Sequence, residues 1–357
     1  MKIIYDHQSF CLSKFNGVSN YFASIIPHIE KMGNECVFPF HYCDSVDLRN
    51  ISGRKFLGTP QFIPYRIARK IQEQVCLFES INYMKHRHYD IIHATQYFPY
   101  LYGYTEKPVV VTVHDMIHEL FNLWPAHALN KKESIEKCSH IIAISENTKK
   151  DILNLYPSVP ESKITVIHHG YSQIPYVDYP NSFGKYILYV GARAKYKNFK
   201  VFFEGIKDLL KKDITLNLVC TGSAFNQEEL RMIEENNLTG QCVSHFFKTE
   251  EMGALYKNAL CFVYPSLYEG FGLPILDAFH FECPVCLSDA SCFPEVAGSA
   301  GCYFDPSNAE SIRDCINSVI YNEEKRREYI EKGLLRKQLF NWEDSAAKHC
   351  GVYSSLI

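Results

Sequence analysis

Short apolar runs rich in β-branched residues alternate with segments of helical periodicity along almost the whole chain. This alternation predicts parallel sheets covered by helices on both faces, because strands that are buried on two sides read as continuous apolar stretches. The chain has 357 residues, which is enough for two domains with a core each. We therefore expect an α/β protein with two doubly wound, Rossmann-like domains.

The expected strands and helices form two series. In the first series we expect strands at 2–5, 36–40, 91–94, 109–113, 140–144 and 164–167, and helices at 19–32, 127–138 and 147–155, the last capped by Ser145. In the second series we expect strands at 186–190, 215–220, 243–246, 260–264, 285–287 and 302–304, and helices at 198–211, 227–235, 250–257 and 306–321.

Between the two series the residues are Tyr, Pro, Ser and Asn without periodicity, a composition typical of a linker. We expect an N-terminal domain over 1–172, a linker over 173–184 and a C-terminal domain over 185–341. Residues 342–357 are expected to form a C-terminal helix that can pack back on the N-terminal domain. Two such domains would face each other with the carboxyl ends of their strands across a central cleft.

The bulk composition excludes some functions. A net charge of −3 argues against a dedicated nucleic-acid binder. The sequence contains no apolar run of the roughly 18–20 residues that a membrane span needs and no signal-peptide pattern, so we expect a cytoplasmic protein. The 14 cysteines are scattered. Even Cys283 and Cys286 are interpreted as buried apolar residues, because Cys286 lies inside an expected strand, and no metal site is predicted.

One segment, 49–72, is basic and carries interleaved aromatic residues. Its cations are Arg49, Arg54, Lys55, Arg66, Arg69 and Lys70, its aromatic residues are Phe56, Phe62 and Tyr65, and no acidic residue lies among them. The plainer interpretation is a solvated face around a loop. The alternative is a peripheral contact with the cytoplasmic face of an anionic membrane, worth at most about 1 kcal/mol for each basic residue.

The most informative motif is Pro-Ser-Leu-Tyr-Glu-Gly-Phe-Gly-Leu-Pro at 265–274, which follows an expected buried strand. It predicts a glycine turn and a helix that begins near Leu273, where Pro274 is tolerated because the first turn makes no use of its N–H. The helix N-terminus would attract an anion. Glu269 and Asp277 flank this position, which suggests a site for a sugar attached to a diphosphate.

Three other segments end expected strands. The first is a turn at 15–19 around Gly17, the second places His114 beside Asp115, and the third carries Arg193 and Lys197 before a helix. Basic side chains at a strand end can hold phosphate oxygens through charge-assisted hydrogen bonds. Taken singly, each segment also fits an ordinary turn, a structural histidine or surface cations.

Together, these motifs resemble those of the family-4 retaining glycosyltransferases, which have the GT-B fold. The resemblance rests on Gly-Val-Ser, Val-His-Asp-Met-Ile, Ile-Ala-Ile-Ser-Glu-Asn-Thr-Lys, Tyr-Val-Gly-x-Arg-x-x-x-Lys-Asn, Tyr-Glu-Gly-Phe-Gly-Leu-Pro and Phe-Pro-Glu-Val-Ala-Gly, in collinear order from about residue 15 to 307. It implies transfer of a sugar from a nucleotide diphosphate donor, held mainly by the C-terminal domain, to an acceptor met mainly by the N-terminal domain.

The resemblance also implies roles for individual residues. The catalytic residues would be His114, Glu269, Arg193 and Lys197. Arg193 and Lys197 would bind the donor diphosphate, which the backbone of Gly17 would also approach, His114 would contact the donor sugar, and Glu269 would bind sugar hydroxyls. The remaining donor-binding residues would be Gly270, Phe271, Gly272, Leu273 and Asp277, and Glu295 would support its loop.

Two positions depart from the family pattern. Asp277 replaces a glutamate that holds the ribose hydroxyls, and Glu282 stands where the family usually has glycine. If that turn needs a positive φ, Glu282 carries a conformational cost.

The mechanism implied is independent of metal ions. The sequence contains no Asp-x-Asp, so Arg193, Lys197 and a helix N-terminus would stabilise the leaving diphosphate instead. No carboxylate can be assigned as a nucleophile, which favours front-face attack. No cofactor is expected, and the donor would be a GDP- or UDP-linked hexose, with mannose favoured.

The acceptor would be a saccharide or lipid-linked oligosaccharide of O-antigen or capsule synthesis, in agreement with a membrane contact through 49–72. Two alternatives stay open: a GT-B-like nucleotide-sugar epimerase, and a non-catalytic subunit that binds sugar nucleotides. Product analysis with donor alone separates the first alternative from a transferase.

Overall fold

The computed structural model describes residues 1–357 except 12–13, 15, 52–54, 59–63 and 179. The chain divides into two compact units. Unit 1 comprises residues 1–170 and 341–357, and unit 2 comprises residues 171–340. Among the described residues, no helix combines the length and the apolar character that a membrane crossing requires.

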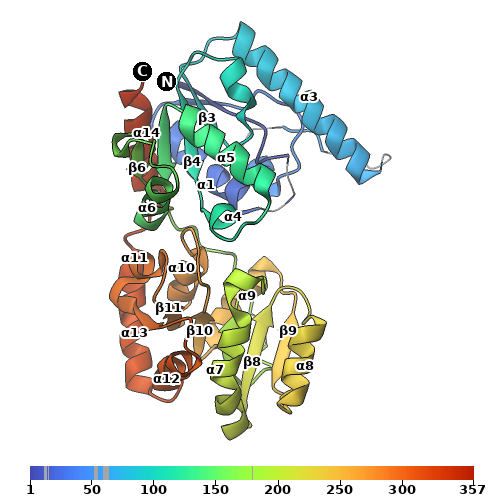
Figure 1. Cartoon of the computed structure of the whole chain (residues 1–357), viewed down its shortest axis with the longest axis vertical. Coiled ribbons are helices and arrows are strands. Elements are labelled where there is room, and N and C mark those ends of the chain that lie inside the picture. The colour runs from blue at the N-terminus through green and yellow to red at the C-terminus, as the bar shows by residue number, and fades with distance from the viewer. Residues whose placement is uncertain (12–13, 15, 52–54, 59–63, 179) are drawn as a thin grey trace. The chain divides into compact units, whose positions relative to one another are not determined.

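Unit 1 is built on a six-stranded parallel sheet in the order β2-β1-β3-β4-β5-β6 (Figure 1). Its strands are β1 (Lys2–Tyr5), β2 (Glu35–Val37), β3 (Ile91–Ala94), β4 (Val109–Val113), β5 (His140–Ala143) and β6 (Ile164–Val166). Its helices are α1 (Gly17–Lys31), α2 (Val46–Arg49), α3 (Tyr65–His86), α4 (Ile117–Leu120), α5 (Pro125–Lys137), α6 (Glu146–Leu155) and α14 (Trp342–Ser355), with short 3₁₀ turns η1 (Pro99–Gly103) and η2 (Glu161–Lys163).

Unit 2 has a second six-stranded parallel sheet, in the order β12-β11-β10-β7-β8-β9. Its strands are β7 (Lys185–Tyr189), β8 (Leu216–Thr221), β9 (Cys242–His245), β10 (Cys261–Tyr264), β11 (Val285–Ser288) and β12 (Gly301–Phe304). Its helices are α7 (Phe199–Lys212), α8 (Gln227–Glu235), α9 (Thr249–Asn258), α10 (Leu273–His280), α11 (Phe293–Ala297), α12 (Ala309–Ile320) and α13 (Glu323–Lys337), with 3₁₀ turns η3 (Lys195–Lys197) and η4 (Gly298–Ala300).

The central strands are buried at every position, as in β4 and β10. A strand buried on both sides needs helices on both faces of its sheet, which is the expected doubly wound arrangement. In unit 1 the core lies between the sheet and α1, and in unit 2 between the sheet, α7 and α12. The α/β fold class expected from the sequence is confirmed.

The C-terminal helix α14 packs against α1 within unit 1. Tyr21 and His349 lie within hydrogen-bond distance, with 2.6 Å between Tyr21 Oη and His349 Nε2, and Tyr353 Oη lies 2.6 Å from His93 Nδ1. Gly170, at the end of the first segment of unit 1, lies so close to the indole of Trp342 that a Cβ would come within 2.4 Å of it. The side chains of α14 therefore complete the core of unit 1.

The segment 171–184 contains no helix or strand among its described residues. It is nevertheless attached to unit 2, since the Val177 N–H donates to the Glu250 carbonyl at 2.9 Å and the Tyr176 ring stacks on Phe281 at 5.8 Å.

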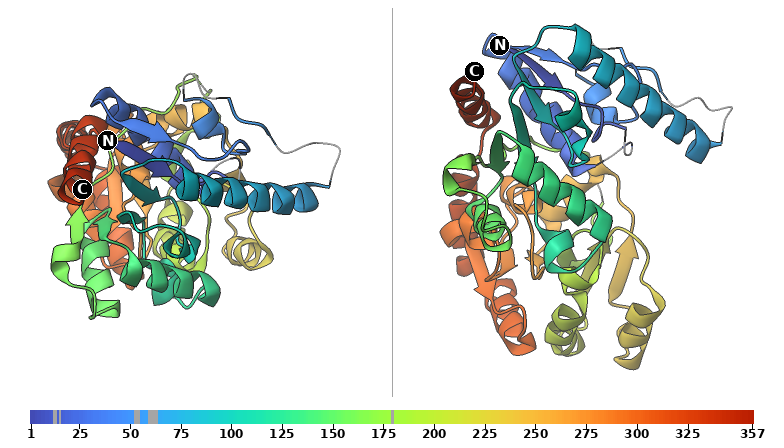
Figure 2. Two further views of the ribbon diagram at one scale, coloured as in Figure 1. Left: turned by 90° about the horizontal axis from the view of Figure 1, so that it is seen from above. Right: turned by 45° about the horizontal axis from the view of Figure 1, so that its top comes forward.

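Helix α3 is the main correction to the expected secondary structure. The segment 49–72 was expected to be a loop, but its last eight residues form the first part of this 22-residue helix (Figure 2). The buried positions of α3 repeat every four residues, and they are Ala68, Gln72, Cys76, Ser80 and Met84. Because Gln72 and Ser80 are polar, the apolar periodicity that would predict the helix is weak. Arg54 and Phe62 lie outside the described residues, as does the side chain of Tyr65.

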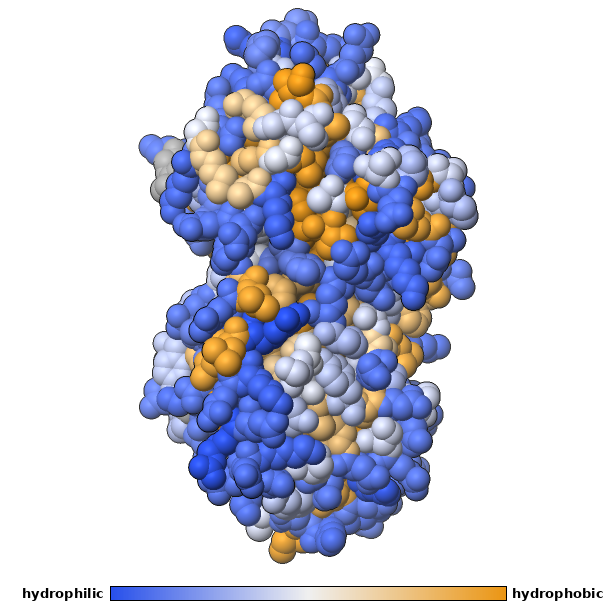
Figure 3. All heavy atoms as spheres, turned by 90° about the vertical axis from the view of Figure 1, so that its left-hand side faces the viewer, coloured by the Kyte–Doolittle hydropathy of each residue, from blue (hydrophilic) through white to orange (hydrophobic). Residues whose placement is uncertain are grey.

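On the face shown in Figure 3, hydrophilic side chains dominate and apolar side chains form separate patches.

The Glu282 backbone has a φ of 58°, so the turn after α10 does place a non-glycine residue in the left-handed region.

Candidate active site

The switch point of the unit 2 sheet lies between β7 and β10. These neighbouring strands are each followed by a connection that leads away from the other, to β8 and β11 respectively. Ligands of open α/β sheets bind at the carboxyl ends of strands at such a point. The loop after β7 carries Arg193 and Lys197, and the loop after β10 carries Glu269 and Gly272.

Lys197 and Glu269 form an ion pair between these two loops. Lys197 Nζ lies 2.5 Å from Glu269 Oε1, and the two side chains are 15% and 11% exposed. The ammonium group also lies 5.3 Å from the ring centres of Tyr196 and Tyr264. The Leu267 N–H donates to the Tyr196 carbonyl at 2.8 Å, so the loops are joined by a backbone bond as well.

The backbone of Glu269 is fixed by Ser291, a residue that sequence reasoning missed. The Ser291 hydroxyl donates to the Glu269 carbonyl at 2.7 Å and accepts from the Glu269 N–H at 3.2 Å. Ser291 itself has a φ of 54°, a conformation that costs a non-glycine residue energy and tends to occur at functional sites. A single serine in a loop carries no sequence signal for this role.

Helix α10 begins where the motif predicted, with Gly272 as its N-cap and Pro274 in its first turn. Gly272 has a φ of 92°, and a Cβ at this position would lie 3.1 Å from Ile275 and 3.3 Å from Phe293. Both conformation and space therefore require glycine. The positive end of the helix dipole lies beside the loop of Glu269.

Asp277 lies further along α10, next to Tyr171. Burial raises the pKa of the Asp277 carboxyl to about 7, and the nearby Tyr171 hydroxyl opposes that rise. At neutral pH this carboxyl is thus close to half protonated, and it can both donate and accept hydrogen bonds.

Arg193 is held inside its own loop region. Its side chain is 3% exposed, Nε lies 3.0 Å from Glu229 Oε1, and Nη2 donates to the carbonyls of Ser223 and Ala224 at 2.5 and 2.8 Å. Its guanidinium also lies over the Phe225 ring. Nη1 is buried and has no partner among the described residues. A phosphate could reach this group only if the surrounding loop moves.

Asn198 was predicted only as a helix start, but it has a structural role in the donor loop. It adopts a φ of 59°, and its side-chain amide donates to the Pro306 carbonyl at 2.7 Å. This contact attaches the end of the Lys197 turn to the loop after β12. Glu295 accepts from Arg336 through its backbone carbonyl, which holds α11 against α13.

In unit 1, His114 directly follows β4. Its backbone N–H donates to the Tyr97 hydroxyl at 3.1 Å. The centre of its ring lies 5.0 Å from that of Tyr21 and 6.0 Å from that of His169. Burial lowers the pKa of His114 to about 4, so the imidazole is neutral at pH 7. Its Nε2 atom has no hydrogen-bond partner among the described residues.

Gly17 is the first residue of α1, which Asn16 caps by accepting from the Ser19 N–H at 2.8 Å. A Cβ on Gly17 would meet no described atom within 4 Å, so packing inside unit 1 does not require glycine here. Phe15 lies outside the described residues. Gly17 and His114 belong to unit 1, whereas Arg193, Lys197 and the residues 269–277 belong to unit 2.

The cysteines 283 and 286 are buried, and Cys286 lies in β11. The fold gathers other cysteines that are distant in sequence, with Cys302 Sγ 3.0 Å from Cys315 Sγ. Within the described ranges, no group of three or more His, Cys, Asp or Glu residues is arranged to hold a metal ion.

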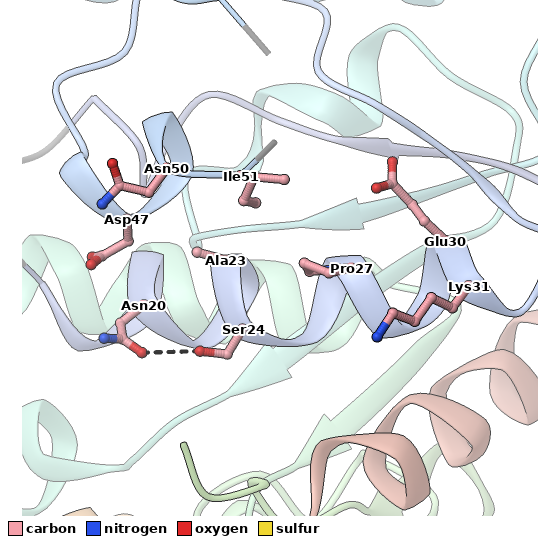
Figure 4. A pocket seen from close by; sticks show the side chains of 9 residues that line it. All are labelled: Asn20, Ala23, Ser24, Pro27, Glu30, Lys31, Asp47, Asn50 and Ile51. Atoms are coloured by element: carbon pink, nitrogen blue, oxygen red, sulfur yellow. Dashed lines mark hydrogen bonds between the residues drawn. The ribbon is translucent and has the colours of Figure 1, made fainter. Parts of the chain in front are cut away.

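Unit 1 has a hollow of about 780 Å³ along α1, lined by Asn20, Ala23, Ser24, Pro27, Glu30, Lys31, Asp47, Asn50 and Ile51 (Figure 4). The Ser24 hydroxyl donates to Asn20 Oδ1 there. None of the predicted site residues lines this hollow.

Comparison with protein families gives two matches that together span most of the chain. Residues 15–172 match the model described as Glycosyltransferase Family 4, and residues 180–336 match that described as Glycosyl transferases group 1. The boundary between the two matches falls close to the division between the two units.

Among curated proteins, the chain is similar to two O-antigen enzymes. It is 26% identical to O-antigen chain mannosyltransferase B of Escherichia coli over 270 residues, which cover 69% of this chain and 70% of that protein. It is 28% identical to O-antigen chain mannosyltransferase RfbU of Salmonella typhimurium over 189 residues, which cover 53% of each chain.

Among solved structures, the fold is similar to Anabaena Alr3699/HepE in complex with UDP and glucose, with a TM-score of 0.75, 15% identity and 99% of each chain covered. It is also similar to sucrose-phosphate synthase from Thermosynechococcus elongatus, with a TM-score of 0.72, 19% identity and coverage of 99% and 98%. At these identities the likeness concerns the fold, which is that of the GT-B glycosyltransferases.

Proposed function

Because the chain belongs to the family-4 glycosyltransferases, we propose that it transfers a hexose, and specifically mannose, from a nucleotide diphosphate donor to a saccharide acceptor of O-antigen or capsule synthesis. The similarity to two O-antigen mannosyltransferases supports mannose as the sugar. GDP is the preferred nucleotide and UDP the alternative. The configuration at the transferred carbon is retained in this proposal.

The Lys197–Glu269 pair at the switch point of unit 2 is the observation that carries the proposal. Both side chains are largely buried. Lys197 lies in the loop after β7, and Glu269 lies in the loop that leads into α10. A diphosphate placed at the N-terminus of α10 would meet the Lys197 ammonium, and charge-assisted hydrogen bonds of this kind contribute about 1.5–3 kcal/mol each. The donor would displace Lys197 from Glu269 or share it, and Glu269 would then bind sugar hydroxyls.

The leaving nucleotide diphosphate gains negative charge in the transition state, and the protein must stabilise this charge. In the proposed mechanism the α10 dipole supplies positive potential that is already in position. Lys197 and Arg193 add theirs once the donor has displaced Glu269 and the loop around Arg193 has moved. The sequence contains no Asp-x-Asp pair to bind a cation, so transfer is proposed to be independent of metal ions. Full activity in EDTA supports this step, whereas loss of activity that only Mg²⁺ or Mn²⁺ restores contradicts it.

The acceptor is proposed to be a lipid-linked oligosaccharide at an anionic membrane surface, and α3 supports this part. Ile67, Ile71 and Phe78 are 54%, 53% and 71% exposed on one side of this helix. Arg66 and Lys70 are exposed beside the two isoleucines. Apolar side chains flanked by cations are suited to the interface of a membrane with anionic lipids.

A thermal-shift screen with GDP, UDP, ADP and dTDP tests the donor site. We expect GDP to raise the melting temperature most, and an equal response to all four nucleotides contradicts a specific donor site. Product analysis then separates the reactions. Transfer of mannose from GDP-mannose to an oligosaccharide acceptor supports the proposal, whereas conversion of the donor without acceptor supports an epimerase or hydrolase.

A further inference from the structure

Unit 1 has its own switch point, between β1 and β3. The strand order places these two strands side by side, with the connection of β1 leading to β2 and that of β3 leading to β4. A pocket of about 310 Å³ lies where the two strands end. His7 and Gln8 from the loop after β1, Gln96 and Phe98 from the loop after β3, and His127 and Asn130 from α5 contribute to its lining. Its size and position are those of a small-molecule subsite.

Apart from Arg69 and Glu73, the polar groups that line the pocket are uncharged at neutral pH. Burial lowers the pKa of His7, and burial with the nearby His118 and Lys131 lowers the pKa of His127 to about 4. The Nδ1 atoms of His118 and His127 are buried without a partner among the described residues. The cation Lys131, which contributes to this field, is itself paired with Glu119 at 3.0 Å. Such a lining suits hydroxyl groups better than an anion.

A strained and exposed tryptophan lies close to this pocket in the connection between α4 and α5. Trp124 is 73% exposed and has a φ of 46°, and Asn122 has a φ of 51°. A left-handed conformation is rare for a bulky residue and is kept only where the surrounding structure imposes it. Here the Leu123 N–H donates to the His118 carbonyl, and the Trp124 carbonyl accepts from the His127 N–H, both at 2.9 Å.

A continuous series of rings joins this tryptophan to the pocket. The Trp124 ring lies 5.1 Å from His118, His118 lies 4.4 Å from His127, and His127 lies 5.4 Å from Tyr97. His127 and Tyr97 both line the pocket. The exposed indole is therefore the outer end of an aromatic and imidazole wall.

We propose that this wall is the subsite for the acceptor oligosaccharide, with one sugar ring stacked on Trp124 and the next in the pocket between His7 and His127. The proposal rests on the glycosyltransferase function proposed above. A sugar ring has an apolar face, which packs on an indole, and hydroxyls at its edge, which hydrogen-bond to neutral imidazole and amide groups. The pocket also carries Arg69 and Glu73, whose opposite charges favour a neutral ligand.

Fluorescence gives a direct test, because the chain has only two tryptophans. Trp342 is 6% exposed, so acrylamide in solution quenches Trp124 almost alone. With α-linked mannotriose as the probe, we expect the quenching constant to fall by about half or more, as it should when a ring covers an exposed indole. Glycerol at equal hydroxyl concentration is the control and should leave quenching unchanged. Unchanged quenching with saturating mannotriose overturns the proposal.

Kinetics with variants provide the second arm. Trp124→Ala should raise KM for an oligosaccharide acceptor about tenfold, the factor expected for loss of one aromatic contact, while KM for the donor stays unchanged. Trp124→Phe should restore most of the affinity, and His127→Ala should weaken it. The exposed Leu335 on α13 provides the matched control, Leu335→Ala. Equal acceptor KM values in wild type and Trp124→Ala overturn the proposal.

The outcomes separate this subsite from the proposed function. Protection of Trp124 by mannotriose in a protein without transferase activity would support the subsite and contradict the function. Transfer of mannose by a protein whose Trp124 ignores the acceptor would support the function and contradict the subsite. Protection by anionic vesicles but not by mannotriose would assign Trp124 to the membrane and overturn the proposal.

Discussion

Lys197 and Glu269 are 72 residues apart in the sequence, yet their side chains form a 2.5 Å ion pair across the two loops at the switch point of unit 2. The fold brings them together because β7 and β10 are neighbours in the sheet. The ammonium group that the donor is proposed to use is thus already neutralised by the carboxylate that is proposed to hold the sugar. Binding of the donor must rearrange this pair.

Lys197→Ala should reduce kcat about 100-fold or more, because about 3 kcal/mol of stabilisation of the leaving diphosphate is removed. Steady-state rates with GDP-mannose measure the effect. Lys200→Ala is the matched control, since this lysine is close in sequence but its side chain is 72% exposed. A Lys197→Ala enzyme with the rate of the Lys200→Ala enzyme would refute the assignment.

Glu269→Gln separates the two proposed functions of the Lys197–Glu269 pair, which are binding of the diphosphate by Lys197 and binding of the sugar by Glu269. The amide no longer competes for the Lys197 ammonium, so we expect GDP to bind about three- to tenfold more tightly, a gain of about 0.7–1.4 kcal/mol. Transfer should nevertheless slow, because the amide is a weaker partner for sugar hydroxyls than a carboxylate. Calorimetry with GDP and kinetics measure the two effects. Weaker GDP binding would show that Glu269 assists the diphosphate instead.

Arg193→Ala should lower the free energy of unfolding by about 3 kcal/mol, because the buried Glu229 carboxylate loses its cation. Urea unfolding measures this loss, and adding Glu229→Gln should recover part of it. Arg231 is exposed on α8, the helix that carries Glu229, and provides the control. For Arg231→Ala we expect the free energy of unfolding to change by no more than about 0.5 kcal/mol. If the Arg193→Ala protein keeps both its stability and its thermal shift with GDP, Arg193 neither stabilises the fold through Glu229 nor binds the diphosphate.

The strands were the most predictable part of the fold. Those at 2–5, 91–94 and 109–113 have the expected bounds, because a strand buried on both faces is an apolar run that ends where polar residues begin. Helix α3 was not predicted, since Gln72 and Ser80 occupy two of its buried positions. The 15-residue α13 was missed too, and only Gly333 is fully buried in it, so it lacks an apolar stripe.

The candidate site was predictable only where a motif marks it. The motif at 265–274 indicated the start of α10 correctly, and the conformation of Glu282 agrees with the family's preference for glycine there. The pairing of Arg193 with Glu229 and the hold of Ser291 on Glu269 depend on contacts between separate loops. Local patterns contain no information on such contacts, so sequence reasoning could not find them.

Asp277 should make stability depend on pH. Its pKa is about 7 in the folded protein and 3.8 as the ordinary value, so between roughly pH 4 and 7 the folded state keeps a proton that the unfolded chain has released. The free energy of unfolding should therefore decrease as pH rises through this range, by on the order of 4 kcal/mol from this group. Asp277→Asn should remove the dependence, which urea unfolding at pH 5 to 8 measures. If the free energy of unfolding depends on pH in the same way in wild type and in Asp277→Asn, the Asp277 carboxyl is solvated and its pKa is not raised.

Arg66→Glu with Lys70→Glu should weaken binding to vesicles that contain anionic lipid by about 30-fold or more at low salt, since each cation contributes about 1 kcal/mol. Sedimentation with liposomes measures the partition. The exposed pair Lys211 and Lys212 in unit 2 provides a matched control of equal charge change. Wild-type protein that stays in solution with these vesicles would remove the membrane contact from the proposal.

Glu282→Gly should stabilise the protein by about 0.5–1 kcal/mol. The left-handed backbone of Glu282, with its φ of 58°, costs roughly 1–2 kcal/mol for a residue with a Cβ, and the greater freedom of glycine in the unfolded chain takes back about 0.5–1 kcal/mol. The side chain is exposed and the turn lies between α10 and β11, so little contact is lost. The urea midpoint at an unchanged slope measures the gain. The matched control, Glu331→Gly, lies within α13 at an exposed helical position, where glycine should destabilise by about 1 kcal/mol. A loss of stability in both variants would mean that the Glu282 side chain contributes more than its backbone costs.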